Sequence, residues 1–466
     1  MNAPEKTLKA WAKPTLSSHR VGVMNKFGAV RQQFHQTELD GVNIEPLLEQ
    51  FGSPLFILSE KTLRNNVRRL RRAFATRWPK VRHGWSYKTN YLNAVCSILH
   101  QEGSWAEVVS EFEYQKARAL GVPGSRIIFN GPSKPTAILE QALQEGAQIH
   151  IDHLDEIYAL EQVAQKLNKK VAVGIRLNFD TGYTESWSRF GFNLESGAAM
   201  DAVQRIASSQ WLTLTGLHSH IGTFILDVRA YAAQARIMAE FMDKVESSTA
   251  CRIEYLDIGG GFASRNALQG LYLPPDQLVP SFDQYAEAIT GALLEATRTR
   301  SAAGKPLPTL IMETGRAVVD DAEFLITRVV GGKRLPDGRR AAILDAGVNL
   351  LFTGFWYNHE VKPLRQLDGT PEETVLYGPL CMNIDVLRSS VMLPPLNVGD
   401  ALLISSVGAY NNTQWMQFIQ YRPAVVMITQ EGNVEVVRVA EQLAAINDFE
   451  RLPDALRLPF PQGLPE

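Results

Sequence analysis

The sequence has few of the features that mark secreted or membrane proteins. Its 466 residues include only three cysteines, Cys96, Cys251 and Cys381, and they form no CxxC pair. So few cysteines exclude a disulfide framework and indicate a reducing compartment. No apolar run approaches membrane-spanning length, and the first residues carry charges where a signal peptide would be apolar. We therefore predict a cytoplasmic protein that does not cross a membrane.

An excess of charge of one sign is also missing. Lys and Arg number 47 against 49 Asp and Glu, so nothing favours broad electrostatic binding to nucleic acid or to an anionic membrane. The chain contains no internal repeat, no G-x-G-x-x-G motif and no Walker lysine after a glycine-rich turn. What remains fits an enzyme that acts on a small molecule. The length suggests one large domain plus a second one.

Strand-like and helical patterns alternate through the first two thirds of the chain. This alternation predicts a parallel sheet, and eight such units predict a closed (β/α)8 barrel of the TIM type. The sequence offers nine candidate strands, one more than a barrel needs, and we expect the first of them to join the other domain. The candidate strands are residues 54–59, 81–88, 105–110, 126–130, 148–152, 171–178, 212–221, 255–259 and 309–313.

From about residue 325 the pattern changes to short apolar or alternating runs, separated by Gly, Pro and Asp, with no long helix between them. This pattern predicts an all-β domain. We therefore divide the chain into an N-terminal arm that packs partly with the β domain (1–50), a barrel (51–325) and a C-terminal β domain (326–466). The predicted β strands are residues 341–345, 374–377, 401–406, 424–429 and 434–437.

The segment 83–91, His-Gly-Trp-Ser-Tyr-Lys-Thr-Asn-Tyr, places Lys88 at the C-terminal end of a predicted strand, before an expected helix. Catalytic residues of α/β barrels lie at such strand ends. Apolar neighbours there would lower the pKa of Lys88 and make it a nucleophile suited to Schiff-base formation. The alternative is a solvated lysine at the end of a strand.

Two other strand ends carry residues suited to a phosphate and a nitrogen ring. Gly259, Gly260 and Gly261 follow an apolar strand, and the exposed N–H groups of such a loop suit one phosphate group. Glu313 and Arg316 follow another strand: Arg316 suits the phosphate, and Glu313 suits a ring nitrogen that its charge keeps protonated. The alternatives are an ordinary tight turn and a surface ion pair of little energetic value.

His218 and His220 are two residues apart on a predicted strand, so both point to one face. In a barrel such a pair can bind a metal, with His150 and His153 recruited to the same site. The alternative is that each is a polar residue satisfied by hydrogen bonds within a strand.

Short motifs in a fixed order extend these observations. Together they resemble the fold-type III pyridoxal-phosphate decarboxylases, the family of diaminopimelate and ornithine decarboxylases, over roughly residues 45–430. The resemblance implies an alanine racemase-like barrel with a C-terminal β domain, and pyridoxal 5'-phosphate as cofactor. The motifs are Tyr87-Lys88-Thr-Asn90, Arg176 with Ser188-Arg-Phe-Gly191, His218-Ser-His220-Ile-Gly-Thr223, Asp257-Ile-Gly-Gly-Gly261, Glu313-Thr-Gly-Arg316, Asp345-Ala-Gly347, Gly378-Pro-Leu-Cys381 and Gly408-Ala-Tyr410.

The same resemblance implies roles for individual residues. Lys88 would bind the cofactor covalently, His220 would stack on its ring and Glu313 would pair with its ring nitrogen. Cys381 would reach the active site of the partner subunit in a homodimer and deliver a proton to the substrate carbon. No metal is implied. The other residues implied to bind the cofactor are Arg176, Thr223, Gly260, Gly261, Arg316 and Tyr410.

Two departures from the family pattern concern the substrate. Met382 stands where an acidic residue would read the substrate's distal amine, and Thr353 stands where diaminopimelate decarboxylases carry an arginine. The segment 408–414, Gly-Ala-Tyr-Asn-Asn-Thr-Gln, together with residues 86–90 and Cys381-Met382, is most similar to the branch found in siderophore biosynthesis, which decarboxylates amino acids conjugated to citrate. We expect the substrate to contact Met382, Asp385, His359 and Asn411.

Three alternatives remain open from the sequence. The first is an ordinary decarboxylase for diaminopimelate, ornithine, lysine or arginine. The second is a metal-dependent hydrolase built on His218 and His220, and the third is a catalytically silent relative that binds a partner protein.

Overall fold

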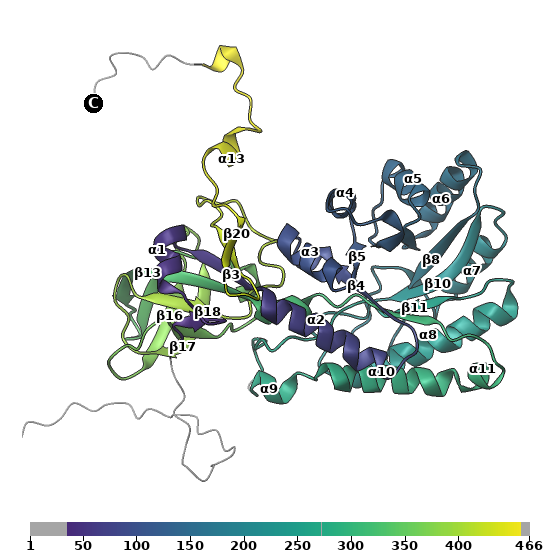
Figure 1. The fold of residues 1–466 in the computed structure, drawn as a ribbon, viewed down its shortest axis with the longest axis horizontal. Coiled ribbons are helices and arrows are strands. Elements are labelled where there is room, and N and C mark those ends of the chain that lie inside the picture. Colours follow the sequence, from purple (N-terminus) through teal and green to yellow (C-terminus); the bar gives the residue numbers. More distant parts are fainter. Residues whose placement is uncertain (1–34, 272, 458–466) are drawn as a thin grey trace, which may run out of the picture. The chain divides into compact units, whose positions relative to one another are not determined.

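Eight parallel strands close into a barrel in the computed structural model, which describes residues 35–271 and 273–457 (Figure 1). Pairing of β12 with β4 and of β10 with β8 completes the ring, and the short β9 (Phe192–Asn193) pairs with β8 outside it. The predicted barrel is confirmed, strand for strand. Its strands are β4 (Val81–Ser86), β5 (Trp105–Val108), β6 (Ile127–Phe129), β7 (Gln148–Ile151), β8 (Val171–Asn178), β10 (Leu212–Ser219), β11 (Tyr255–Asp257) and β12 (Thr309–Met312).

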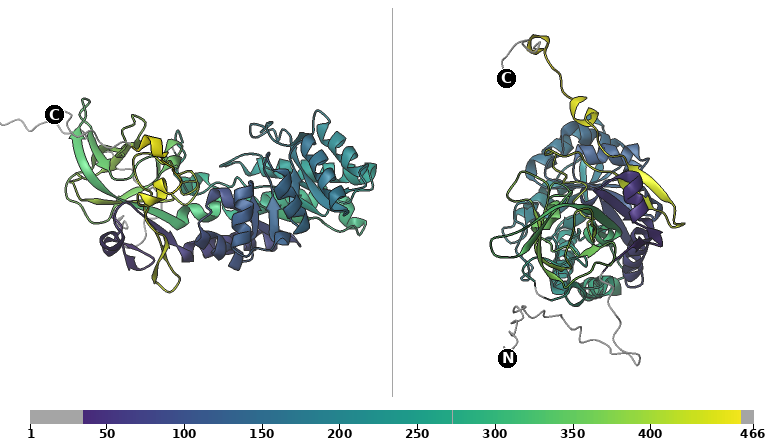
Figure 2. Two further views of the ribbon diagram at one scale, coloured as in Figure 1. Left: turned by 90° about the horizontal axis from the view of Figure 1, so that it is seen from above. Right: turned by 90° about the vertical axis from the view of Figure 1, so that its left-hand side faces the viewer.

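Helices cover the outside of the barrel, and the longer ones each bury an apolar face. In α2, apolar positions at helical spacing are buried, and the preceding Ser59 side chain caps the helix by accepting a backbone N–H bond. Figures 1 and 2 show this purple helix beside the green α10. The helices are α2 (Glu60–Ala75), α3 (Asn93–Gln101), α4 (Glu111–Ala119), α5 (Thr136–Gln144), α6 (Leu154–Lys166), α7 (Ala198–Ala207), α8 (Val228–Ser248), α9 (Pro275–Leu278), α10 (Phe282–Ala296), α11 (Arg298–Ala302) and α12 (Arg316–Val319).

The second sheet contains strands from both ends of the sequence. β3 (Leu55–Ser59) pairs with β13 and β19, so it belongs to this sheet and not to the barrel (Figure 1). The barrel therefore begins after the predicted boundary at residue 51, with α2. The other strands are β13 (Glu323–Arg334), β14 (Arg340–Leu344), β15 (Val361–Pro363), β16 (Glu372–Tyr377), β17 (Val386–Leu393), β18 (Ala401–Ile404), β19 (Val425–Ile428) and β20 (Val434–Arg438). A short helix, α13 (Ala444–Asn447), follows them.

Residues 35–51 pack against this sheet through α1 (Glu45–Phe51), which follows the two-residue strands β1 (Glu38–Leu39) and β2 (Val42–Asn43). Leu47 and Leu48 of α1 are buried in one cluster with Ile57 of β3 and Ile326 of β13. The remainder of the predicted N-terminal arm, residues 1–34, lies outside the described residues. Among the helices that the structure describes, none is long and apolar enough to cross a membrane.

A buried carboxylate lies where the barrel meets the β domain. Glu323, the first residue of β13, is fully buried and accepts hydrogen bonds from Asn90 Nδ2 (3.0 Å) and Asn412 Nδ2 (2.5 Å). Burial raises the pKa of Glu323 to about 8, although both amides oppose this rise. The junction therefore contains a titratable group that exchanges its proton at neutral to alkaline pH.

We expect Glu323→Gln to stabilise the chain more at pH 8 than at pH 5. The pKa of Glu323 is about 8 when folded and near 4.5 when unfolded. Between these values the unfolded state is ionised and the folded state keeps its proton, so this group's contribution to stability falls as pH rises. Glutamine has no group that titrates in this range. The free energy of unfolding of the variant, relative to that of the parent, should therefore rise by on the order of 1–3 kcal/mol between pH 5 and pH 8.

Denaturant unfolding at pH 5, 6.5 and 8 measures this difference. Glu435→Gln, on the exposed side of β20, is the matched control and should show no such trend. A gain for Glu323→Gln that is the same at all three pH values would contradict the expectation.

Candidate active site

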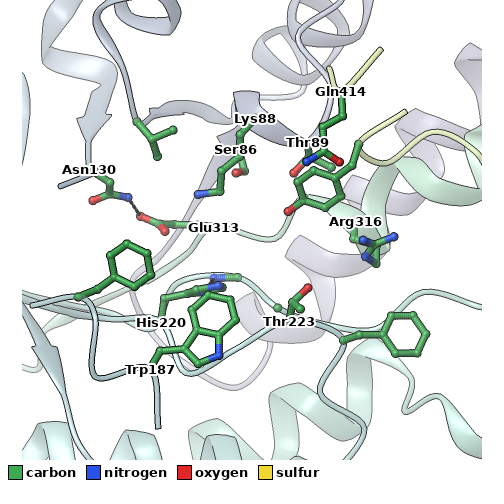
Figure 3. Close-up of a pocket in the computed structure, with 18 of the residues that line it drawn as sticks. Ser86, Lys88, Thr89, Asn130, Trp187, His220, Thr223, Glu313, Arg316 and Gln414 are labelled. Carbon is green, nitrogen blue, oxygen red and sulfur yellow. Dashed lines mark hydrogen bonds between the residues drawn. The ribbon is translucent and has the colours of Figure 1, made fainter. Parts of the chain in front are cut away.

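A cavity of about 580 Å³ opens at the C-terminal ends of the barrel strands (Figure 3). Catalytic sites of such barrels lie at this face. All nine residues that the sequence predicted to bind a cofactor line it, although they are spread over more than 300 positions of the chain. They are Lys88, Arg176, His220, Thr223, Gly260, Gly261, Glu313, Arg316 and Tyr410.

Lys88 lies in a 3-10 turn (Tyr87–Thr89) directly after β4; the α-helix expected here begins later, at Asn93. Its Nζ lies 3.3 Å from Oε1 and 3.4 Å from Oε2 of Glu107. Burial lowers the pKa of Lys88, but the carboxylates of Glu107 and Glu313 outweigh this effect, so its pKa is raised above the usual value. The prediction that apolar neighbours lower the pKa of Lys88 is therefore wrong, because Glu107 and Glu313 lie close to it.

The turn that carries Lys88 is fixed by the β domain. The backbone N–H of Tyr410 donates to the carbonyl of Thr89 (2.8 Å), and the Thr413 hydroxyl donates to the carbonyl of Lys88 (2.9 Å). Asn90 Nδ2 also donates to the carbonyl of Gly408 (3.0 Å). The lysine's backbone is therefore held from both domains.

An amide joins the two carboxylates of the site. Asn130 Nδ2 donates to Glu107 Oε1 (2.9 Å) and to Glu313 Oε1 (2.6 Å), and Figure 3 shows the second bond. The pKa of Glu107 is raised, chiefly by its burial. Sequence reasoning missed both Glu107 and Asn130. The available signal was a single acid within the apolar run Trp-Ala-Glu-Val-Val, at the same strand ends that carry the other site residues.

The two histidines of the H-x-H motif have different surroundings. His220 Nδ1 accepts the N–H of Gly260 (3.1 Å), and Trp187 packs edge-on against its ring at 5.3 Å. His218 is stacked on His150 at 4.8 Å, and its Nε2 lies 3.4 Å from Glu313 Oε2. Burial lowers the pKa of His218 and of His220 well below the usual value, which keeps both rings neutral near pH 7.

These positions do not favour the metal alternative. Among the described residues, His150, His218 and Glu313 form the one group whose ligand atoms are close enough to hold a metal ion. His150 already uses both ring nitrogens, toward Asn130 Oδ1 (2.7 Å) and the Tyr255 hydroxyl (3.1 Å). His220 is not a member of this group, so the predicted histidine pair does not converge on one point.

The opposite end of the cavity is built around Arg316. Its guanidinium lies 4.6 Å from the ring centre of Tyr357 and 4.9 Å from that of Tyr410. Nε and Nη1 of Arg316 are buried and have no hydrogen-bond partner among the described residues. Buried donors without a partner are costly, so this end of the cavity is suited to an anion that accepts from them.

The glycine loop after β11 leaves no room for side chains. A Cβ at Gly260 would lie 2.6 Å from the carbonyl oxygen of Glu313, and one at Gly261 would overlap the carbonyl of Gly222. Gly261 also has a φ of 96°, which other residues rarely adopt. The backbone of this loop therefore forms the cavity wall itself, as a close approach to a phosphate requires.

An aromatic wall completes the cavity, and one of its members, Phe190, lies in the Ser188-Arg-Phe-Gly191 motif. Trp187, Phe190 and Trp356 line it, and the Arg176 guanidinium lies 4.3 Å from the ring centre of Phe190. Trp187 and Phe190 come from the loop after β8, whereas Trp356 comes from the β domain. Trp187, directly before that motif, was not identified from the sequence, because nothing local separates an aromatic residue that lines a cavity from one in a packed core.

The predicted substrate contact of Asp385 requires a correction. Asp385 accepts the backbone N–H groups of Val348 (2.8 Å) and Leu380 (2.7 Å), and none of the four residues predicted to contact the substrate lines the cavity of its own chain. Asp385 therefore holds the backbone at Val348 and at Leu380, which is next to Cys381, and does not offer a free carboxylate. A buried carboxylate without hydrogen bonds would destabilise the fold, so the hydrogen-bonded arrangement of Asp385 is the more stable one.

His359 and Asn411 are also used internally. His359 Nε2 lies 2.9 Å from the Thr353 hydroxyl, and Asn411 Oδ1 accepts from the Thr353 backbone and hydroxyl, both at 3.0 Å. Cys381 is exposed and Met382 packs partly against the β-domain core. The sequence does not reveal that the side chains of His359 and Asn411 point toward Thr353 and not into the cavity. For Met382, which follows Cys381 in the chain, contact with the substrate stays a prediction.

The arrangement of the cavity residues fits pyridoxal 5'-phosphate. Lys88 can bind its aldehyde, Glu313 can pair with its ring nitrogen, and the Arg316 end of the cavity suits its phosphate. The comparisons with known proteins agree. Residues 62–320 match the family described as "Pyridoxal-dependent decarboxylase, pyridoxal binding domain". The chain belongs to this family, and pyridoxal phosphate is its cofactor.

Relatives cover nearly the whole chain. Diaminopimelate decarboxylase of Methanothermobacter thermautotrophicus is 30% identical over 90% of this chain and 96% of its own length. The crystal structure of diaminopimelate decarboxylase from M. jannaschii in complex with L-lysine has a TM-score of 0.82 and 25% identity, covering 90% of this chain and 96% of that one. Lysine/ornithine decarboxylase of Vibrio vulnificus with cadaverine has a TM-score of 0.70 and 25% identity, covering 83% and 97%. The chain is therefore an amino-acid decarboxylase by family.

Proposed function

We propose that this chain removes the α-carboxyl group of a diamino acid, with diaminopimelate as the first substrate to test. Relatives named as diaminopimelate decarboxylases support this proposal, since they align over almost their full length. The observation that carries it is the convergence of Lys88, Glu313 and Arg316 in one cavity of sufficient size. Cavities of several hundred Å³ accommodate a cofactor together with a small substrate.

In this proposal Lys88 holds the cofactor, Glu313 pairs with its ring nitrogen and Arg316 and Tyr410 bind its phosphate, with Thr223, Gly260 and Gly261. His220, which lines the same cavity, would pack against the cofactor's ring. When bound, the cofactor's protonated ring accepts the electron pair that remains on Cα after carbon dioxide leaves. Glu313 keeps that ring protonated.

Glu107 gains a role from its position. Lys88 must lose a proton to act as a nucleophile, and the carboxylate of Glu107 lies 3.3 Å from its Nζ. The raised pKa of Glu107 favours acceptance of that proton. Asn130 holds this carboxylate and Glu313 in fixed places relative to each other.

Cys381 is proposed to act in a second copy of the chain. It is exposed and does not line the cavity of its own chain, as expected if it delivers a proton to Cα in a homodimer with shared sites. We therefore expect two inactive variants, Lys88→Ala and Cys381→Ala, to restore activity when mixed. With random pairing, half of the dimers are mixed and each has one intact site, so about a quarter of the wild-type activity should return.

The mixture is prepared by refolding or coexpression and compared with each variant alone. Cys251→Ala, a cysteine outside the cavity, is the control and should be fully active alone. Failure of the mixture to exceed either variant would contradict shared active sites.

A second candidate substrate is an amino acid whose distal amine is acylated, such as a citrate conjugate. It is favoured by Met382 and by the cavity lining, in which Glu313 is the one carboxylate among the described residues. If Glu313 pairs with the cofactor, a free distal ammonium would find no further carboxylate among the described residues that line this cavity and would lose a charge-assisted hydrogen bond. Thr353, whose hydroxyl bonds to His359 and Asn411, offers no charge to it.

One experiment separates these candidates. The chain loaded with pyridoxal phosphate is offered diaminopimelate, ornithine, lysine and arginine, and in parallel citryl conjugates of diamino acids, and decarboxylated products are detected by mass spectrometry. Turnover of free diaminopimelate supports the first proposal. Turnover confined to the conjugates replaces it with the second, and release of no carbon dioxide from any substrate would sink both.

A further inference from the structure

A second buried acid lies at the domain junction, on the side of Arg316. Asp320 begins the 3-10 turn Asp320–Ala322 directly after α12 and is 1% exposed. It is four residues beyond Arg316, and its Oδ2 lies 3.8 Å from Arg316 Nη1. It does not line the cavity, so any effect on the cofactor must pass through residues that do.

Asp320 contacts the β domain as well as the barrel. Its Oδ1 accepts the backbone N–H of Ala409 (3.3 Å), and its own carbonyl accepts the N–H of Gly408 (3.1 Å). Its Oδ2 accepts from the Ser264 hydroxyl and from Asn266 Nδ2 (3.4 Å) in the barrel. One carboxylate therefore joins the glycine-loop side of the barrel to the turn before Tyr410.

The turn before Tyr410 has a strained backbone that needs contacts with its surroundings to stay in place. Tyr410 has a φ of 68°, a left-handed conformation that a tyrosine adopts only when its surroundings impose it. Gly408 packs so closely on the carbonyl of Val319 that a Cβ would overlap it. The hydrogen bonds that Asp320 accepts from Gly408 and Ala409 thus fix this strained segment. The ring of its Tyr410 lies 4.9 Å from the Arg316 guanidinium.

We propose that Asp320 is a positioning residue that sets Tyr410 and Arg316 relative to each other and thereby determines the affinity for the cofactor's phosphate. This inference rests on the proposed assignment of these two residues to the phosphate. Asp320 has no contact with Lys88, and the two side chains that it positions, the Arg316 guanidinium and the Tyr410 ring, face each other at the proposed phosphate end, so its removal should affect that end most.

Geometry and charge predict opposite effects, which makes the proposal testable. A carboxylate near Arg316 repels a phosphate, so removal of its charge alone would strengthen phosphate binding. Loss of the hydrogen bonds to Ala409 and Ser264 would displace Tyr410 and weaken binding. Burial raises the pKa of Asp320 to about 6, so at pH 8 the parent carries the charge and both effects are present.

The experiment measures dissociation constants at pH 8 for pyridoxal phosphate and for pyridoxal, which lacks the phosphate, by equilibrium dialysis of the cofactor-free full chain. Asp320→Ala should weaken binding of pyridoxal phosphate about tenfold or more and change pyridoxal binding less than about twofold. Asp320→Asn keeps an acceptor for Ala409, so it should bind pyridoxal phosphate more tightly than Asp320→Ala does.

The matched control is Asp321→Ala, since Asp321 is bonded to Asn66 on α2 and lies outside the cavity lining. Melting temperatures establish that each variant is folded. Equal losses for both ligands, or wild-type binding in Asp320→Ala, would overturn the inference. A parent chain that does not bind pyridoxal phosphate at all would instead overturn the proposed function.

Discussion

Replacing Lys88 by alanine is expected to abolish borohydride-stable attachment of pyridoxal phosphate and to lower kcat by roughly 10²–10⁴-fold. Lys88 lines the cavity together with Glu313 (Figure 3), and its Nζ lies 3.3 Å from Glu107 Oε1. The variant also leaves the Glu107 carboxylate without its cationic partner, so cofactor-free Lys88→Ala should melt at a lower temperature than the parent. Peptide mass spectrometry after borohydride reduction locates the label, and steady-state kinetics gives kcat.

Lys166→Ala is the control, because this exposed lysine pairs only with Glu140 on the outside of the barrel. Lys134 is the informative competitor. It is fully buried near the cavity, but Glu156 (2.7 Å) and two backbone carbonyls occupy its ammonium group. Label on Lys134 in the parent, or retained label in Lys88→Ala, would contradict the assignment of Lys88.

Replacing Glu313 by glutamine is expected to lower kcat by roughly 10²–10⁴-fold while covalent attachment to Lys88 persists. Glutamine has nearly the same shape, and its oxygen can still accept from Asn130 Nδ2, so the local structure should be kept. It lacks the negative charge that keeps a ring nitrogen protonated. The electron pair left on Cα then has a weaker acceptor.

Glu107→Gln provides the comparison, since it changes the other acid that Asn130 holds. We expect Glu107→Gln to slow attachment of the cofactor to Lys88 more than it slows the chemical step. Single-turnover kinetics separates the two stages. Wild-type kcat in Glu313→Gln would show that the ring nitrogen does not depend on this carboxylate.

Much of the fold was predictable because local patterns carry it. Alternation of apolar runs and helical periodicity identified all eight barrel strands, and the surplus run 54–59 was expected in the other domain, where β3 lies. The exact start of the barrel was less predictable. Nothing local distinguishes a buried strand that pairs with β13 and β19 from one that enters a barrel.

The cofactor residues were predictable for a related reason. Each lies in or directly after a predicted strand, or within a short motif, and barrel topology brings the C-terminal ends of parallel strands to one face. The direction of the Lys88 pKa shift was not predictable, since it depends on Glu107, which is 19 positions away in the chain and adjacent in space.

The sequence by itself therefore determined the barrel, the β domain, the cofactor and the residues at the strand ends, because these depend on periodicity and on short motifs. Only the tertiary structure decided that Asp385, His359 and Asn411 are used internally, and that Asp320 and Glu323 join the two domains. Side-chain direction and the pairing of buried polar groups depend on contacts between residues far apart in the chain. Periodicity carries no information about such contacts.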